Sequence, residues 1–149
     1  RKDFIFESYE LYETALLEAD VFLLISSLLT NKELKELIEL GKQLGMDPLV
    51  EAHTDEDLKK AVDSGAEIIG INNRDLRTLK VDLNRAKRLI PHLPKGVTPV
   101  VESGISTYED LMEYKSIGVN TFLIGSAIMK SKDVVEKIQS LLGTNKKWK

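Results

Sequence analysis

The chain of 149 residues contains no cysteine, only four prolines and a single tryptophan. The lack of cysteine excludes a disulfide scaffold, a thiolate nucleophile and a cysteine-ligated zinc site. A formal net charge of −3 with mixed signs disfavours a dedicated nucleic-acid binder. The longest apolar run, Val21–Ile25 with Leu28 and Leu29, is broken by two serines and is too short for the roughly 20 residues that span a bilayer. The charged segment Arg1 to Phe4 lacks the hydrophobic region of a signal peptide. We therefore expect a cytoplasmic globular domain without membrane or nucleic-acid partners.

Short apolar runs rich in β-branched residues alternate with stretches of helical period. Capping signals and glycines mark several helix ends. The expected strands are 4–6, 21–25, 48–50, 67–71, 98–101 and 121–124. The expected helix stripes are Leu34, Leu37, Ile38 and Leu44; Leu58, Ala61 and Val62; Leu83, Ala86, Leu89 and Ile90; and Val134, Val135, Ile138, Leu141 and Leu142. Capping boxes are expected at Thr30 with Glu33 and at Ser106 with Glu109, and helix ends at Gly45, Gly65 and Gly118.

This alternation predicts an α/β fold whose parallel sheet is covered by helices. Six strands admit an open doubly wound sheet or part of a (β/α)8 TIM barrel. No Gly-rich phosphate-binding turn follows Phe6, which weakens the doubly wound reading. We expect residues 1–143 to form a partial barrel of about six βα units. Residues 144–149 are expected to form a tail whose Trp148 packs back on the domain.

Polar residues follow the expected strands where reactive groups of parallel α/β folds collect, and Lys2 is expected on the first strand itself. Lys2, Glu51, Asn72 and Glu102 supply a lysine, two carboxylates and an amide that can handle protons. The turns Ser103–Gly104 and Gly125–Ser126 can bring backbone N–H groups close to a phosphate. Barrels often bind phosphate after strands seven and eight. On that numbering, the chain begins at the third strand and lacks the first two βα units.

Five segments together resemble indole-3-glycerol-phosphate synthase. They are 1–5 (RKDFI), 49–53 (LVEAH), 70–76 (GINNRDL), 101–106 (VESGIS) and 123–129 (LIGSAIM). The resemblance covers the C-terminal three-quarters of that barrel, from the third strand to the eighth helix. It implies ring closure and decarboxylation of carboxyphenylamino-deoxyribulose phosphate to indole-glycerol phosphate, in tryptophan biosynthesis. No metal or organic cofactor is implied.

Carried over by this resemblance, Lys2 is the general acid that protonates the substrate carbonyl oxygen. Glu51 is the carboxyl group that handles protons in the dehydration. Substrate contacts are implied for Asn72, Glu102 and Ser103, and phosphate binding for Gly104, Gly125 and Ser126. Phe4 and Leu123 are implied as walls against the aromatic ring.

The family's first-strand Lys-x-x-Ser-Pro-Ser segment has no counterpart here. The chain is therefore expected either to be inactive alone or to be completed by an N-terminal fragment or by self-association, because open sheet edges favour pairing. Two alternatives stay open. One is phosphoribosylanthranilate isomerase, which would require a cysteine; the other is an inactive folding or design fragment. His53 is expected at a helix start and His92 in a loop, and neither is expected to bind a metal.

Overall fold

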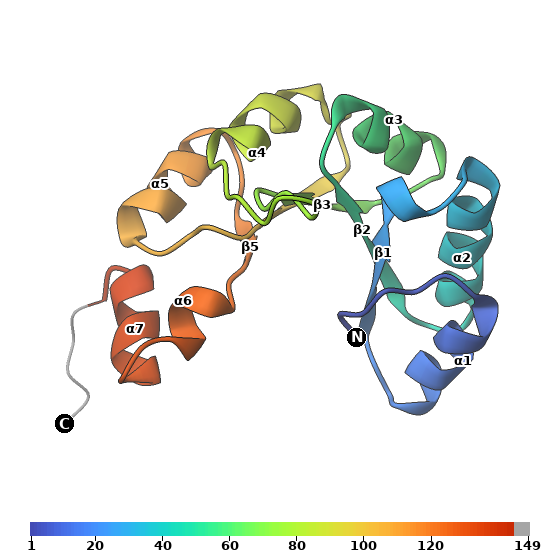
Figure 1. The fold of residues 1–149 in the computed structure, drawn as a ribbon, viewed down its shortest axis with the longest axis horizontal. Helices are drawn as coiled ribbons and strands as arrows, with labels where there is room; N and C mark the ends of the chain where they lie inside the picture. Colours follow the sequence, from blue (N-terminus) through green and yellow to red (C-terminus); the bar gives the residue numbers. More distant parts are fainter. Residues whose placement is uncertain (145–149) are drawn as a thin grey trace.

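A computed structural model describes residues 1–144. Figure 1 shows a curved sheet with its helices arranged along the convex side, so that the chain forms an arc. The C-terminal segment 145–149, including Trp148, lies outside the described residues, and the domain boundary at residue 143 stays a prediction. The strands are β1 (Val21–Ile25), β2 (Asp47–Ala52), β3 (Ile68–Asn72), β4 (Thr98–Glu102) and β5 (Thr121–Leu123). The helices are α1 (Ser8–Leu16), α2 (Asn31–Gln43), α3 (Asp55–Asp63), α4 (Asn84–Leu89), α5 (Tyr108–Ser116), α6 (Ser126–Met129) and α7 (Val134–Leu141), with 3₁₀ turns η1 (Ser26–Leu28) and η2 (Ile90–His92).

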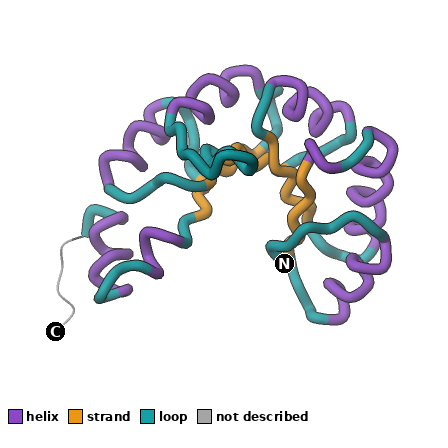
Figure 2. Tube along the Cα trace, viewed as in Figure 1, coloured by secondary structure: helices purple, strands orange, loops and turns teal. Residues whose placement is uncertain are grey.

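Within residues 1–144, the sheet has five parallel strands in the order β1-β2-β3-β4-β5. A doubly wound sheet reverses its strand order at a switch point and carries helices on both faces. Here the order never reverses, and Figure 2 shows the helices outside the strands. This arrangement is that of a barrel wall, which confirms the predicted incomplete (β/α)8 barrel.

Alternation along each strand divides its side chains between two apolar clusters. Odd-numbered residues of β1 and β2, such as Leu23 and Leu49, form a small inner cluster with Val100 of β4. Their neighbours, such as Phe22 and Val50, point the other way and are buried in the main core under the helices. Because side chains alternate between the faces of a strand, Glu51 lies on the same inner face as Leu49.

The expected first strand, residues 4–6, is wrong. Arg1 instead pairs with β1, since its amino group donates to the carbonyl oxygen of Val21 at 2.5 Å and its own carbonyl accepts from Leu23 N at 3.1 Å. Beyond this point side-chain carboxylates take the backbone donors. Asp3 accepts from Phe4 N at 2.9 Å, and Glu10 accepts from Phe6 N at 2.7 Å. The Phe4 amide is therefore bonded to the preceding side chain and the Phe6 amide to a residue in the first turn of α1, so neither amide pairs with a strand.

The predicted helix signals are mostly confirmed. Thr30 and Glu33 form the expected capping box of α2, while the box of α5 is made by Thr107 and Asp110, one residue beyond the predicted pair. Gly45, Gly65 and Gly118 follow helices and have positive φ angles of 81°, 83° and 91°.

The stripe predicted for α7 is largely exposed. Only Leu141 of its five residues is buried, and Val135 is 61% exposed. The helix packs mainly on α6 and α5, and its remaining apolar residues are exposed. Exposed apolar residues also lie on α1 at the opposite end of the arc, where Leu16 is 83% exposed. No helix among residues 1–144 is both long and apolar enough to cross a membrane.

Candidate active site

Three neighbouring strands present polar side chains at the carboxyl end of the inner face. Glu51 is the penultimate residue of β2, and Asn72 and Glu102 are the last residues of β3 and β4. Asn72 pairs with Glu102 across the sheet, and Glu102 pairs with Leu123 of β5. The sequence analysis expected these residues just after the strands, whereas the structure places them within the strands, at or next to the last residue of each. Backbone ladder bonds therefore hold their Cα positions.

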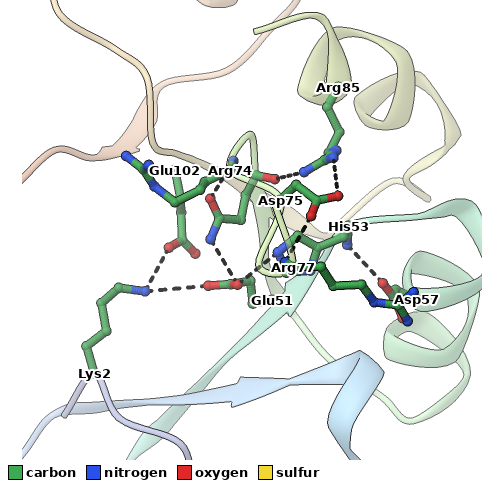
Figure 3. A network of polar contacts seen from close by, with 10 residues as sticks. Lys2, Glu51, His53, Asp57, Arg74, Asp75, Arg77, Arg85 and Glu102 are labelled. Carbon is green, nitrogen blue, oxygen red and sulfur yellow. Dashed lines mark hydrogen bonds and ion pairs between the residues drawn. The ribbon is translucent and has the colours of Figure 1, made fainter. Parts of the chain in front are cut away.

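Lys2 lies across the two carboxylates. Its Nζ atom is 3.2 Å from Oε2 of Glu102 and 3.5 Å from Oε2 of Glu51 (Figure 3). The lysine side chain is 53% exposed, but both glutamate side chains are only 1% exposed. Partial burial disfavours the ammonium, yet the charges of Glu102 and Glu51 outweigh it and raise the pKa of Lys2. Lys2 is consequently a charged proton donor at neutral pH.

Burial raises the pKa of Glu102 from 4.5 to about 7. The negative charge of Glu51 adds to this effect, and Lys2 opposes it. Oε1 of Glu102 is buried and accepts no hydrogen bond from residues 1–144. A Cβ atom at Gly70 would lie 2.2 Å from that oxygen, so glycine at position 70 makes room for the carboxyl group. A carboxyl group with this pKa can either accept or donate a proton near neutrality.

The other oxygen of Glu51 faces two nitrogen atoms. Nδ2 of Asn72 donates to Oε1 of Glu51 at 3.0 Å, and Nε2 of His53 lies 3.2 Å from the same oxygen. The Asn72 side chain is fixed in turn, because its Oδ1 accepts from Arg74 N at 2.9 Å. The backbone carbonyl oxygen of Asn72 accepts a hydrogen bond from the Arg85 guanidinium at 3.0 Å. Glu51 is thus held on one side by Lys2 and on the other by Asn72.

The turn after β4 has an unusual backbone. Ser103 and Gly104 both have positive φ angles, 64° and 84°. A Cβ atom at Gly104 would lie 2.5 Å from Cγ1 of Val81, so packing as well as conformation requires glycine there. The side chain of the buried Asn73 donates to the Ser103 carbonyl at 3.1 Å and to the Tyr114 hydroxyl at 2.9 Å, which anchors the turn.

Gly125 differs from Gly104. Its φ angle is −112°, and a Cβ atom there would meet no atom within 4 Å. Neither conformation nor internal packing therefore requires glycine at this position. Ser126 begins the short helix α6 directly after it.

All ten predicted site residues line one cavity of about 400 Å³. Phe4, which is 55% exposed, and Leu123 supply apolar walls. The structure therefore brings the predicted site residues together around one cavity, although the roles of the residues stay predictions. The ten are Lys2, Phe4, Glu51, Asn72, Glu102, Ser103, Gly104, Leu123, Gly125 and Ser126.

The sequence analysis missed several lining residues. Arg74 and Leu76 enter the cavity from the loop after β3, which turns back so that Arg74 pairs antiparallel with Val81. Both lie within the segment 70–76, so their proximity to Asn72 was a usable signal. His53 was expected at a helix start; it does precede α3, but its ring also lies beside Glu51. In the part of the chain described, no group of three or more His, Asp or Glu residues is placed to hold a metal ion.

Comparisons with known proteins agree with one family. A family model described as indole-3-glycerol phosphate synthase matches residues 1–141. Two relatives of that name, from Caldanaerobacter subterraneus subsp. tengcongensis and Aquifex aeolicus, are each 46% identical, covering 93% and 96% of this chain. The chain spans 56% of the length of each, less than the three-quarters expected from the strand count.

Solved structures support the same fold at low sequence identity. The 3-hexulose-6-phosphate synthase of Salmonella typhimurium has a TM-score of 0.72 at 18% identity, covering 95% of this chain and 71% of that one. The tryptophan synthase complex of Pyrococcus furiosus has a TM-score of 0.68 at 22% identity, covering 91% and 59%. At these identities the likeness concerns the fold alone.

Proposed function

The chain belongs to the indole-3-glycerol phosphate synthase family, and from this premise we propose that it serves the family's step of tryptophan biosynthesis. In that step carboxyphenylamino-deoxyribulose phosphate is closed and decarboxylated to indole-glycerol phosphate. The observation that carries the proposal is the convergence of Lys2, Glu51, Asn72 and Glu102 on one cavity that two Gly/Ser turns also line.

Lys2 is the proposed general acid. Its ammonium group is half-exposed to the cavity and held by two carboxylates, so it can give a proton to the substrate carbonyl oxygen as the ring carbon attacks. Glu51 is proposed to handle protons during the dehydration. Asn72 keeps Glu51 oriented, and Glu102 and Ser103 complete the polar contacts. Holding the aromatic ring against the carbonyl group is mostly a matter of positioning, for which Phe4 and Leu123 supply the walls.

The substrate phosphate is proposed to bind at Gly104, Gly125 and Ser126. Gly104 lies in the turn after β4, Gly125 follows β5 and Ser126 begins α6, so all three lie toward the end of the sheet opposite β1 and β2. Gly125 supports this assignment, because its missing side chain leaves open space that internal packing does not use. A backbone without a Cβ atom allows an anion to approach its N–H groups closely.

We further propose that the two ends of the arc are covered in the active protein, by a second copy or by a complementing N-terminal fragment. Among residues 1–144, both outer strands have a free sheet edge, apart from the contact with Arg1, and α1 and α7 expose apolar side chains. Such edges and patches favour association. Light scattering after size exclusion tests self-association, and a monodisperse monomer at micromolar concentration would contradict it. Cytoplasmic localisation stays a prediction.

The activity is tested by following indole fluorescence after adding carboxyphenylamino-deoxyribulose phosphate. One arm uses the chain alone, and a second adds the part of a relative that this chain does not match. Lys2→Ala is expected to abolish turnover in whichever arm is active. Lys32→Ala is the matched control, since Lys32 is an exposed residue of α2 that pairs with Glu36 on the same helix. No turnover in either arm would support the alternative, an inactive barrel fragment.

A further inference from the structure

A second cavity, of about 520 Å³, lies behind Glu51 and shares no lining residue with the first. His53 lines the second cavity, whereas Glu51 lines the first. The two side chains are nonetheless neighbours: Nε2 of His53 is 3.2 Å from Oε1 of Glu51. Figure 3 shows the histidine on the side of Glu51 that faces away from Lys2. His53 therefore contacts the buried carboxylate on one side and lines the second cavity on the other.

Hydrogen bonds of the surrounding backbone fix the position of His53. The amide of His53 donates to Oδ2 of Asp57 at 3.1 Å, and the Asp57 carbonyl accepts from Oγ of Ser26 at 3.0 Å. The His53 side chain is 12% exposed, and its Nε2 is buried without a hydrogen-bond partner among residues 1–144. Buried polar atoms are usually paired, so an unpaired nitrogen beside a carboxylate calls for a functional explanation.

The proposed reaction needs a proton from solvent. Its substrate carries a carboxylate and a phosphate, and its organic product keeps only the phosphate. Because CO₂ and water are both neutral, charge balance requires one proton to be taken up per turnover. Glu51 is only 1% exposed, and a substrate that fills the first cavity would block the direct path from solvent to this group.

Resting on the proposed function, we propose that His53 relays this proton from the second cavity to Glu51. The Nε2–H bond breaks as an O–H bond forms at Oε1 of Glu51, while Nδ1 takes a proton from water in the second cavity. The ring is left with its hydrogen on Nδ1. To complete the cycle, the side chain rotates so that Nε2 reaches water, where Nε2 gains a proton and Nδ1 releases one before Nε2 returns to Glu51. His53 acts through Glu51 and does not contact the substrate, so it is a positioning residue for the proton.

The second cavity suits water better than a charged ligand. The cations that line it are already paired, and carboxylates from α3 and from the loop after β3 balance their charge. The charged groups facing His53 and this cavity are Glu51 of β2, Asp55, Glu56 and Asp57 of α3, Arg85, which contacts Asp75, Arg88, which contacts Asp82, and His92, which contacts Asp55.

Nitrogen NMR of the histidine rings tests the relay without requiring catalysis. The chain has two histidines, so ¹⁵N-histidine labelling and a His92→Asn variant assign every signal. We expect His53 to carry its proton on Nε2, and Glu51→Gln to change the Nε2 signal. His92 should stay unchanged, because its Nδ1 contacts Asp55 at 2.7 Å, away from Glu51. An unprotonated Nε2, or a signal insensitive to Glu51→Gln, would overturn the relay.

Kinetics then separate proton transfer from simple support of Glu51. His53→Asn keeps a polar side chain beside Glu51 but cannot relay a proton, so kcat should fall about tenfold or more with little change in KM. Added imidazole should partly restore kcat of His53→Ala, and His92→Asn should retain full activity. Wild-type kcat in His53→Asn would refute the relay. If wild-type protein shows no turnover even with the complementing part of a relative, the proposed function fails and the relay, which rests on it, fails with it. The NMR result then reports only the contact between His53 and Glu51.

Discussion

Replacing Glu102 by glutamine should stabilise the chain at alkaline pH. Burial and the neighbouring Glu51 raise the pKa of Glu102 to about 7, against 4.5 in an exposed carboxyl group. Between these pH values the unfolded chain releases a proton that the folded chain keeps. The free energy of unfolding therefore falls as the pH rises through this window, and the loss is complete above about pH 7.

The size of the effect follows from the difference between the two pKa values. Each pH unit corresponds to about 1.4 kcal/mol, so ionising Glu102 should cost the folded state roughly 3 kcal/mol. Glutamine resembles the protonated carboxyl group and does not ionise. The stability difference between Glu102→Gln and wild type should accordingly be larger at pH 8 than at pH 4 by roughly this amount.

Urea denaturation at pH 4 to 8, at one protein concentration, measures this difference. Glu109→Gln is the matched control, because Glu109 is an exposed residue of α5 and its replacement should shift stability by no more than about 0.5 kcal/mol at any pH. A difference between Glu102→Gln and wild type that is constant across the range would refute the assignment of a raised pKa to Glu102. So would a variant that becomes less stable than wild type as the pH rises.

Four further substitutions test how the site and the surrounding fold are supported. Gly70→Ala should destabilise the chain by roughly 1–3 kcal/mol in urea denaturation, because its Cβ atom would displace the Glu102 carboxyl group, while Gly125→Ala should change stability by less than about 0.5 kcal/mol and yet weaken phosphate binding, measured by calorimetry. Equal stability losses in the two glycine variants would contradict this. Thr30→Ala removes the N-cap of α2 and should cost about 1 kcal/mol in the same denaturation assay; a loss below 0.3 kcal/mol would argue against the capping box. Asn73→Ala leaves several buried partners unpaired and should cost about 2–4 kcal/mol in thermal or urea unfolding, and a neutral effect would show that the turn after β4 does not depend on it.

Local patterns in the sequence were sufficient for much of the fold. Six strands were predicted from short β-branched runs, and five of them are present in the structure. The runs are informative because buried parallel strands are apolar on both faces. The site residues were found for a related reason. Polar residues at the end of such a run break its pattern, so Glu51, Asn72 and Glu102 could be recognised, and parallel strands deliver their carboxyl ends to one side of a sheet.

Tertiary contacts decided the rest. Residues 4–6 have a strand-like composition, but Asp3 and Glu10 accept hydrogen bonds from the amides of Phe4 and Phe6, and no local pattern reveals that competition. The apolar stripe of α7 indicated a buried face, whereas burial depends on a partner element that the stripe alone does not specify. The raised pKa of Glu102 depends on its burial and on the neighbouring Glu51, which lies on another strand. The contact between the His53 ring and Glu51 likewise depends on the folded arrangement, which periodicity does not predict. Residue order by itself determined which elements form and where the polar groups stand along them. Only the folded chain set the desolvation and the distances of a few ångströms that give those groups their chemistry.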